Sequence, residues 1–264
     1  MTYSKLKLSL DDRVAVLTLN DPATLNAAGD ELVGDLVDAI ARIASGDIAA
    51  RAIVITGEGR GFCSGANLQG RMGDPATLAE RDVGERLETV FNPLMKALRG
   101  LPVPIVTAVN GPAAGVGASL ALMGDLIVAG ESAYFLQAFR RIGLVPDGGA
   151  TWMLPRMVGK ARAMELMLLG EKLPARTALD WGLINRCVAD AELMPTALGL
   201  ARELANGPAS IGMIRQLVWE GLEAGHDDQL QNERLRQRQA GRTEDNLEGV
   251  RAFLDKRPAV FSGR

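Results

Sequence analysis

The chain has few of the residues on which several common enzyme sites depend. It contains one histidine, His226, and two cysteines, Cys63 and Cys187, among 264 residues. A single histidine in the polar run EAGHDDQ argues against a Ser-His-Asp hydrolase. These three side chains are also too few for a typical zinc site, so we expect no bound metal. Two cysteines far apart are no disulfide framework, which makes a reducing cytoplasm the simplest compartment.

The sequence also lacks the features that direct proteins to membranes or nucleic acid. Its start, MTYSKLKLSLDD, has no apolar signal region, and Gly124 and Asp125 interrupt the apolar stretch at 118–129. The formal net charge is −3, which gives no general attraction for nucleic acid or an anionic membrane. We therefore expect neither kind of partner.

Hydrophobic periodicity predicts an α/β fold. Two alternating runs at 5–10 and 13–19 predict a hairpin, and later apolar strands alternate with helices, which favours right-handed crossovers. After Gly148 only helices are predicted, so the chain is expected to have an α/β front and an all-helical back. The expected strands are 51–57, 103–109 and 125–129; the expected helices are 30–45, 77–99, 115–123, 161–169, 174–181, 194–205, 209–223, 227–239 and 244–254.

Two glycine clusters follow predicted strands. The glycine-rich segment 57–73 begins Gly57-Glu-Gly-Arg-Gly-Phe, and the second cluster reads Gly115-Val-Gly-Ala-Ser-Leu. Neither has the spacing of a dinucleotide-binding motif or the Lys-Ser/Thr of a P-loop, which disfavours a nucleotide cofactor. Glycines let a backbone approach a ligand closely, and a helix start offers free N–H groups to a developing oxyanion. A tight turn is the alternative interpretation of either cluster taken alone.

Several ordered motifs together resemble the crotonase superfamily, the enoyl-CoA hydratase/isomerase family. They extend from Val14 to the terminal FLDKR and lie at 53–57, 61–68, 104–122, 125–129, 143–152 and 253–257. The resemblance implies an α/β crotonase-like ββα spiral with a C-terminal helical trimerisation region. It implies a spiral core with the acyl-CoA site at 1–200 and a helical oligomerisation region at 201–264. A homotrimer or a hexamer, as a dimer of trimers, is expected.

The same resemblance implies the residues of the site. The backbone N–H groups of Ala66 and Val116 match the two oxyanion donors, although the family usually has glycine where Val116 stands. The substrate would be an acyl-CoA thioester, with coenzyme A as part of the substrate and no tightly bound cofactor. The segment 22–27 matches a loop over coenzyme A, and Phe253 and Lys256 would approach the nucleotide from a neighbouring subunit. The candidate substrate-binding residues are Leu25, Cys63, Ser64, Gly65, Gly115, Ser119, Phe139, Leu144, Phe253 and Lys256.

Both glutamates that hydratases of this family use are absent. Ser119 and Phe139 stand at their positions, and Asp147 in VPDGG is the acid that remains. By its motif alone Asp147 reads equally well as a helix N-cap. The surrounding string GLVPDGGATWMLPR looks like the isomerases of phenylacetate catabolism, which convert ring-1,2-epoxyphenylacetyl-CoA to an oxepin and also shift enoyl-CoA double bonds. Their single catalytic aspartate matches Asp147.

One carboxylate is sufficient for an isomerase. A Δ3-to-Δ2 shift takes a proton from the α-carbon and returns it to the γ-carbon, and one base on one face can do both. Burial among Phe139, Val116 and Leu144 is expected to keep the Asp147 carboxylate basic. Hydration or another crotonase reaction, with Asp147 activating water, is an alternative. A non-catalytic acyl-CoA-binding subunit is an alternative of another class.

Overall fold

The computed structural model describes residues 3–68 and 75–264, and it forms two sheets. The six-stranded sheet has the order β1-β2-β3-β4-β6-β9, and the three-stranded sheet has the order β5-β7-β8. β1 and β2 form the predicted antiparallel hairpin, and the other strands of the large sheet are parallel. The strands are β1 Leu6–Asp11, β2 Val14–Leu19, β3 Ala52–Gly57, β4 Ile105–Val109, β5 Pro112–Ala114, β6 Leu126–Gly130, β7 Tyr134–Leu136, β8 Lys172–Pro174 and β9 Arg186–Val188.

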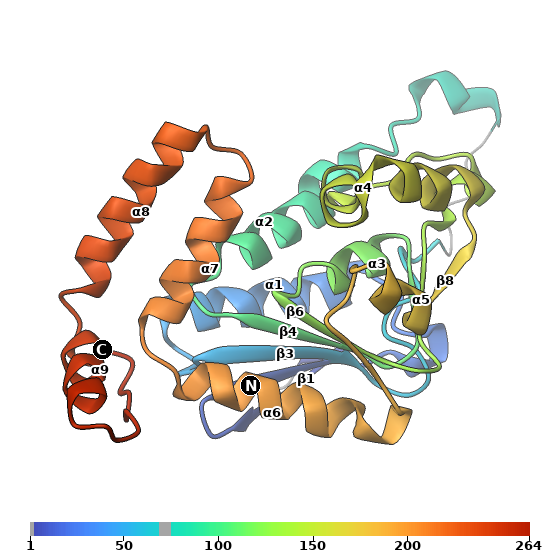
Figure 1. The fold of residues 1–264 in the computed structure, drawn as a ribbon. Coiled ribbons are helices and arrows are strands. Elements are labelled where there is room, and N and C mark those ends of the chain that lie inside the picture. Colours follow the sequence, from blue (N-terminus) through green and yellow to red (C-terminus); the bar gives the residue numbers. More distant parts are fainter. Residues whose placement is uncertain (1–2, 69–74) are drawn as a thin grey trace.

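Helices cover both faces of the large sheet (Figure 1). They are α1 Asp30–Ser45, α2 Asn92–Gly100, α3 Val116–Ala121, α4 Ala150–Leu169, α5 Ala175–Asp180, α6 Leu193–Asn206, α7 Ser210–Gly221, α8 His226–Ala240 and α9 Glu244–Leu254. Short 3-10 turns lie at Pro22–Thr24, Pro75–Glu80, Ala138–Ile142 and Asp190–Glu192, and a π-helical turn lies at Leu87–Phe91. The prediction of a mixed α/β fold is confirmed.

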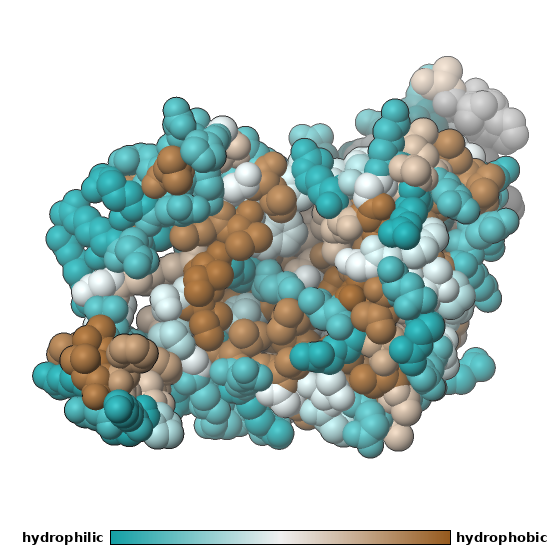
Figure 2. Space-filling model, viewed as in Figure 1, coloured by the Kyte–Doolittle hydropathy of each residue, from teal (hydrophilic) through white to brown (hydrophobic). Residues whose placement is uncertain are grey.

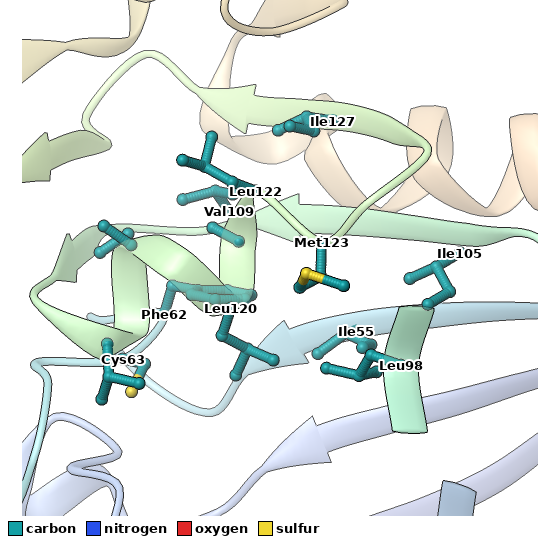
Figure 3. Packing of buried hydrophobic residues seen from close by; sticks show 14 of the residues in the cluster. Ile55, Phe62, Cys63, Leu98, Ile105, Val109, Leu120, Leu122, Met123 and Ile127 are labelled. Carbon is teal, nitrogen blue, oxygen red and sulfur yellow. The ribbon is translucent and has the colours of Figure 1, made fainter. Parts of the chain in front are cut away.

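Two hydrophobic clusters lie on the two faces of the sheet. Val14, Val16 and Val54 belong to the cluster that packs on α6, whose buried residues include Ala197 and Ala201. Small side chains four residues apart let α6 lie close to the sheet. The intervening strand residues belong to the cluster that packs on α1, α2 and α3. Figure 3 shows part of this second cluster, in which Phe62 and Cys63 accompany Leu120 of α3.

Two sequence predictions about elements are wrong. The helix expected over 77–99 is broken at residues 81–84, and helical backbone resumes at residue 85 and continues through the π-helical turn into α2. The Asp82 carboxylate accepts hydrogen bonds from the N–H groups of Gly84 and Glu85, a local turn that competes with a helix. The part after Gly148 is not all helical, because β8 and β9 lie there. Each has three residues, too few for the periodicity of a strand to show.

The remaining differences concern boundaries. α4 begins at Ala150, before the expected 161, and Gly159 at φ 78° interrupts its helical backbone. The expected division at residue 200 falls inside α6, which packs on the sheet as one helix. α7, α8 and α9 project from the body of the molecule, by which we mean the two sheets and the helices α1 to α6 (Figure 1). The part of the glycine-rich segment 57–73 from residue 69 on lies outside the described residues.

A buried ion pair fixes α7 to the body. Arg215 of α7 donates from Nε to the Asp125 carboxylate at 2.6 Å, and its side chain is 2 % exposed. Its other nitrogens donate to carbonyl groups at the end of α2, namely those of Leu98, Arg99 and Leu101. The indole N–H of Trp219 donates to the other Asp125 oxygen at 3.1 Å. Every charged group of this junction therefore has partners.

None of the helices in the described part of the chain combines the length and the apolar character that crossing a bilayer requires.

Candidate active site

Two backbone segments that follow β3 and β4 are bound to each other. The Cys63 N–H donates to the Pro112 carbonyl at 3.0 Å, and the Ala114 N–H donates to the Cys63 carbonyl at 2.9 Å. Gly117 of α3 lies against the same residue, because a Cβ there would collide with the Cys63 carbonyl oxygen. Only glycine allows this approach. The first glycine loop and the start of α3 are thus held as one unit.

This unit contains two backbone N–H groups that have no acceptor among the described residues. Gly65, at φ 103°, lies next to Gly115, so the loop and the helix start meet. On the loop side, the Ala28 N–H donates to the Gly65 carbonyl at 2.7 Å and thereby fixes the backbone before Ala66. No hydrogen bond within residues 3–68 and 75–264 uses the N–H of Ala66 or Val116. Within the described residues, both N–H groups therefore remain without a protein acceptor.

Asp147 does not cap α4. The N-cap residue is Gly149, and α4 has no side-chain cap hydrogen bond within the described residues. The Oδ1 atom of Asp147 is buried and has no hydrogen-bond partner in the described part of the chain. Burial raises the pKa of Asp147 from its ordinary value of 3.8 to about 6. A carboxyl group with such a pKa can take up and release a proton near neutral pH.

Helix α3 supports the backbone at Asp147. Ser119 is fully buried, and its hydroxyl donates to the Asp147 carbonyl at 2.9 Å. Gly148, at φ 59°, lies directly over α3, since a Cβ there would be 2.8 Å from Ser119 Cβ and 3.3 Å from Val116 Cγ2. The Val116 side chain thus lies beside this loop. Ser119, which the sequence predicts to bind substrate, contacts the backbone that carries Asp147.

Phe139 and Leu144 differ in their exposure. Phe139 is 7 % exposed, and its Cζ atom would lie 3.6 Å from a Cβ on Gly115. Leu144 donates its N–H to the Phe139 carbonyl at 3.0 Å, but its side chain is 41 % exposed. Phe139 therefore lies beside Gly115 at the start of α3, whereas the Leu144 side chain is open to solvent.

The coenzyme A candidates fall into two groups. Leu25, at φ 55°, accepts the Ser64 N–H at 2.9 Å, and the Ser64 hydroxyl donates to the Thr24 carbonyl at 2.7 Å. Phe253 is 83 % exposed on α9, and Lys256 follows it; α9 lies far from α3 (Figure 1). One chain thus brings together Leu25, Cys63, Ser64, Gly65, Ala66, Gly115, Val116, Ser119, Phe139, Leu144 and Asp147, and it leaves Phe253 and Lys256 outside this group.

Two asparagines that the sequence reasoning missed brace the first loop. Asn26 is fully buried, and its amide donates to the carbonyls of Glu58 and Gly61 at 3.0 and 2.8 Å. The Asn110 side chain accepts the Gly57 N–H at 3.1 Å and donates to the Gly59 carbonyl at 2.9 Å. Asparagine beside turn residues is a signal for such backbone bracing.

The Cys63 thiol is unsuited to act as a catalytic nucleophile. Burial raises the pKa of the Cys63 thiol to about 11, so it is protonated and a poor nucleophile at neutral pH. Among the described residues, no group of three or more His, Cys, Asp or Glu side chains could hold a metal ion.

A separate apolar cavity of about 400 Å³ lies between α4 and α7. It is lined by residues such as Trp152 and Trp219, and none of the candidate site residues line it.

Comparison with known proteins gives the same family along the whole chain. The sequence profile of the enoyl-CoA hydratase/isomerase family matches residues 10–264. The 1,2-epoxyphenylacetyl-CoA isomerase of Escherichia coli (strain K12) is 46% identical over 252 residues, which cover 95% of each chain. A Rhodobacter capsulatus protein named "Probable enoyl-CoA hydratase" is 44% identical over 269 residues, which cover 100% of both.

Solved structures agree with the sequence comparison. The crystal structure of an enoyl-CoA hydratase/isomerase from Cupriavidus metallidurans CH34 superposes with a TM-score of 0.90 at 29% identity, covering 100% of this chain and 98% of the other. The crotonase-like ββα fold expected from the motifs is therefore confirmed. The chain belongs to the enoyl-CoA hydratase/isomerase family, the crotonase superfamily.

Proposed function

We propose that this protein is an acyl-CoA isomerase in which Asp147 is the one group that moves the proton. The observation that carries the proposal is the Asp147 carboxyl itself. It is partly buried, it caps no helix, and its Oδ1 has no partner among the described residues. Ser119 and Phe139, which replace the two hydratase glutamates, are both buried and carry no acid. A single carboxyl favours moving a proton over adding water.

The proposed reaction passes through a thioester enolate. The Asp147 carboxylate takes the α-proton, and the C–H electron pair moves toward the thioester oxygen. That oxygen accepts hydrogen bonds from the N–H groups of Ala66 and Val116. Asp147 then returns the proton to the γ-carbon, which leaves the double bond conjugated with the thioester. Each oxyanion donor of this kind contributes roughly 3–4 kcal/mol to the transition state.

For the substrate we propose ring-1,2-epoxyphenylacetyl-CoA or a Δ3-enoyl-CoA. Support comes from the relative that is named for the first of these and is 46% identical over 95% of the chain. Coenzyme A would be part of the substrate, and the chemistry described needs no tightly bound cofactor or metal. Hydration with Asp147 activating water is the second candidate, favoured by the name of the relative that is 44% identical. The third is an acyl-CoA-binding subunit without activity, motivated by the missing glutamates.

Acyl-CoA substrates in deuterated water separate these three functions. We expect purified protein to convert a 3-enoyl-CoA, straight-chain or aromatic, to its 2-enoyl isomer, with deuterium appearing at the exchanging carbons. We expect slow loss of the conjugated absorbance of crotonyl-CoA. Fast loss of that absorbance would favour the hydratase. Absence of deuterium exchange with every acyl chain tested would favour the binding subunit.

Gly117→Ala is expected to damage the proposed oxyanion hole. The new Cβ would lie 2.8 Å from Cys63 Cβ and would collide with the Cys63 carbonyl, so the Val116 and Ala66 segments must separate. We expect kcat for isomerisation to fall about 100-fold or more, which corresponds to one misplaced donor. Steady-state kinetics on a 3-enoyl-CoA measure this loss.

Gly34→Ala is the matched control for that change. Gly34 lies within α1, and a Cβ there would meet nothing within 4 Å. We expect full activity and a stability equal to or slightly above that of the unchanged protein, because alanine favours helix. Wild-type kcat in Gly117→Ala would contradict the role given to this contact.

We also propose that the protein assembles into a homotrimer or a hexamer in the cytoplasm, without nucleic acid or membrane as partner. Support comes from apolar side chains exposed on the helices that project from the body. Figure 2 shows hydrophobic residues gathered over α7 and α9 and on the surface beside α7, while α8 is mostly hydrophilic. Those exposed on α7 to α9 are Ile214, Val218, Leu230, Leu235, Leu247, Val250, Phe253 and Leu254. An assembly would also let Phe253 and Lys256 reach the nucleotide of a neighbouring subunit.

A further inference from the structure

We propose that Ser119 is a positioning residue that holds the backbone of Asp147 and leaves the carboxyl group free to move the proton. The inference rests on the proposed function, because Ser119 would act only through Asp147. The observation behind it is one hydrogen bond: the Ser119 hydroxyl donates to the Asp147 carbonyl at 2.9 Å, 28 residues along the chain.

This hydrogen bond is an unusual use of a helical serine. A serine within a helix commonly bonds to a carbonyl of its own preceding turn. Here the Gly115 carbonyl accepts the N–H groups of Ala118 and Ser119, at 3.0 and 3.2 Å. The hydroxyl of Ser119 points instead out of α3 to another segment. Because Ser119 is fully buried, losing this partner would leave its hydroxyl unsatisfied.

The Asp147 carbonyl is held from two sides. It accepts the Ser119 hydroxyl from α3 and the Ala150 N–H at 3.1 Å from the start of α4. The carboxyl group of the same residue is not held in this way, since its Oδ1 has no partner in the described part of the chain. The main chain of Asp147 is thus fixed while its side chain is free to turn, which suits a base that must reach two carbon atoms in turn.

The close contact between Gly148 and α3 is a second link between this helix and the backbone at Asp147. Gly148 lies so close to Ser119 that a Cβ on it would be 2.8 Å from Ser119 Cβ and 3.0 Å from Ser119 Oγ. A glutamate at position 119 would have to project into the space that the 147–149 backbone occupies. The small serine and the glycine are thus complementary. Val116, three residues earlier on α3, offers the oxyanion N–H, so one short helix fixes the oxyanion donor relative to the base.

Ser119→Ala tests the positioning role. We expect kcat to fall about tenfold, as the loss of one well-made hydrogen bond predicts, while KM changes less than about twofold. We also expect the acidic limb of the pH profile of kcat/KM to move to lower pH, because a loosened loop would hydrate the carboxyl group. Unchanged kcat together with an unchanged acidic limb would overturn the proposal.

Thr56→Val is the matched structural control. Thr56 is buried, and its hydroxyl donates to the Ala108 carbonyl at 2.8 Å, away from Asp147. We expect this variant to lose a similar amount of stability and to keep both kcat and the pH profile. If Thr56→Val lowers kcat and shifts the acidic limb as much as Ser119→Ala does, Ser119 has only a structural role and the proposal is overturned.

Three further variants cover the remaining outcomes. Should Ser119→Ala not fold, Ser119→Cys keeps the shape with a weaker donor, and we expect an intermediate loss of kcat; wild-type kcat would contradict the proposal. In the double variant with Asp147→Asn, Ser119→Ala should cause no further loss, and a further tenfold loss would contradict it. Full activity of Asp147→Asn alone would instead overturn the proposed function. An inactive Asp147→Asn beside an unaffected Ser119→Ala would overturn only the positioning role.

Discussion

Asp147→Asn is expected to lower isomerisation by about a thousandfold or more while acyl-CoA binding persists. The amide has nearly the shape of the carboxyl group but cannot take the α-proton, and a positioned general base contributes roughly 10²–10⁴-fold. The Ala66 and Val116 donors stay in place, so the thioester oxygen still has its partners. Single-turnover kinetics measure the loss, and calorimetric titration with a saturated acyl-CoA measures binding.

The same substitution is expected to stabilise the folded protein at neutral pH. Burial raises the pKa of Asp147 from 3.8 to about 6, so the folded protein binds this proton more tightly than the unfolded chain does. The stability of the unchanged protein therefore falls as the pH rises from about 4 to about 6, and the deficit persists above that range. Asparagine has no such cost. We expect a gain of about 1–2 kcal/mol at pH 7, reduced by the partial hydration of the group, and no gain near pH 4.

Asp180→Asn is the control for both effects. Asp180 ends α5 and its side chain is exposed. We expect its substitution to leave kcat unchanged and to change the free energy of unfolding at pH 7 by less than about 0.5 kcal/mol, as is usual for a surface position. An Asp147→Asn variant with full activity would remove Asp147 from the mechanism, and one with no gain in stability at pH 7 would show that the carboxyl group is better solvated than its burial implies.

Arg215→Met is expected to lower the free energy of unfolding by about 3–5 kcal/mol, which is the usual effect of removing one partner of a buried ion pair. The Arg215 side chain is 2 % exposed and donates both to Asp125 and to three carbonyl groups at the end of α2. Methionine fills a similar volume but donates nothing. Urea denaturation followed by circular dichroism measures the change.

Arg234→Met provides the comparison for this stability effect. Arg234 is exposed on α8, and its Nε donates only to Gln231 of the same helix, at 3.2 Å. Surface substitutions of this kind usually change stability by less than about 0.5 kcal/mol. Equal losses in the two variants would show that the junction of α7 with the body contributes little to folding.

Much of the site could be predicted because its signals are local in the sequence. A Cβ at Gly65 or Gly117 would collide with neighbouring backbone, and Gly65 and Gly115 have positive φ angles. The absence of glutamate at 119 and 139 is visible without any structure. The roles of Asn26 and Asn110 could not be predicted in this way. Each depends on the backbone carbonyl groups to which the side-chain amide donates, and some of these lie more than thirty residues away.

By itself, the sequence determined the family and the parallel strands, and it indicated Asp147 as the acid of the candidate site. These follow from periodicity and from ordered motifs, which are properties of neighbouring residues. Only the tertiary structure showed that the Asp147 side chain does not cap α4, a role that the VPDGG motif equally allowed. It also paired Ser119 with Asp147 and Arg215 with Asp125, 28 and 90 residues apart. Such pairs depend on how elements pack in space, and no local pattern encodes that distance.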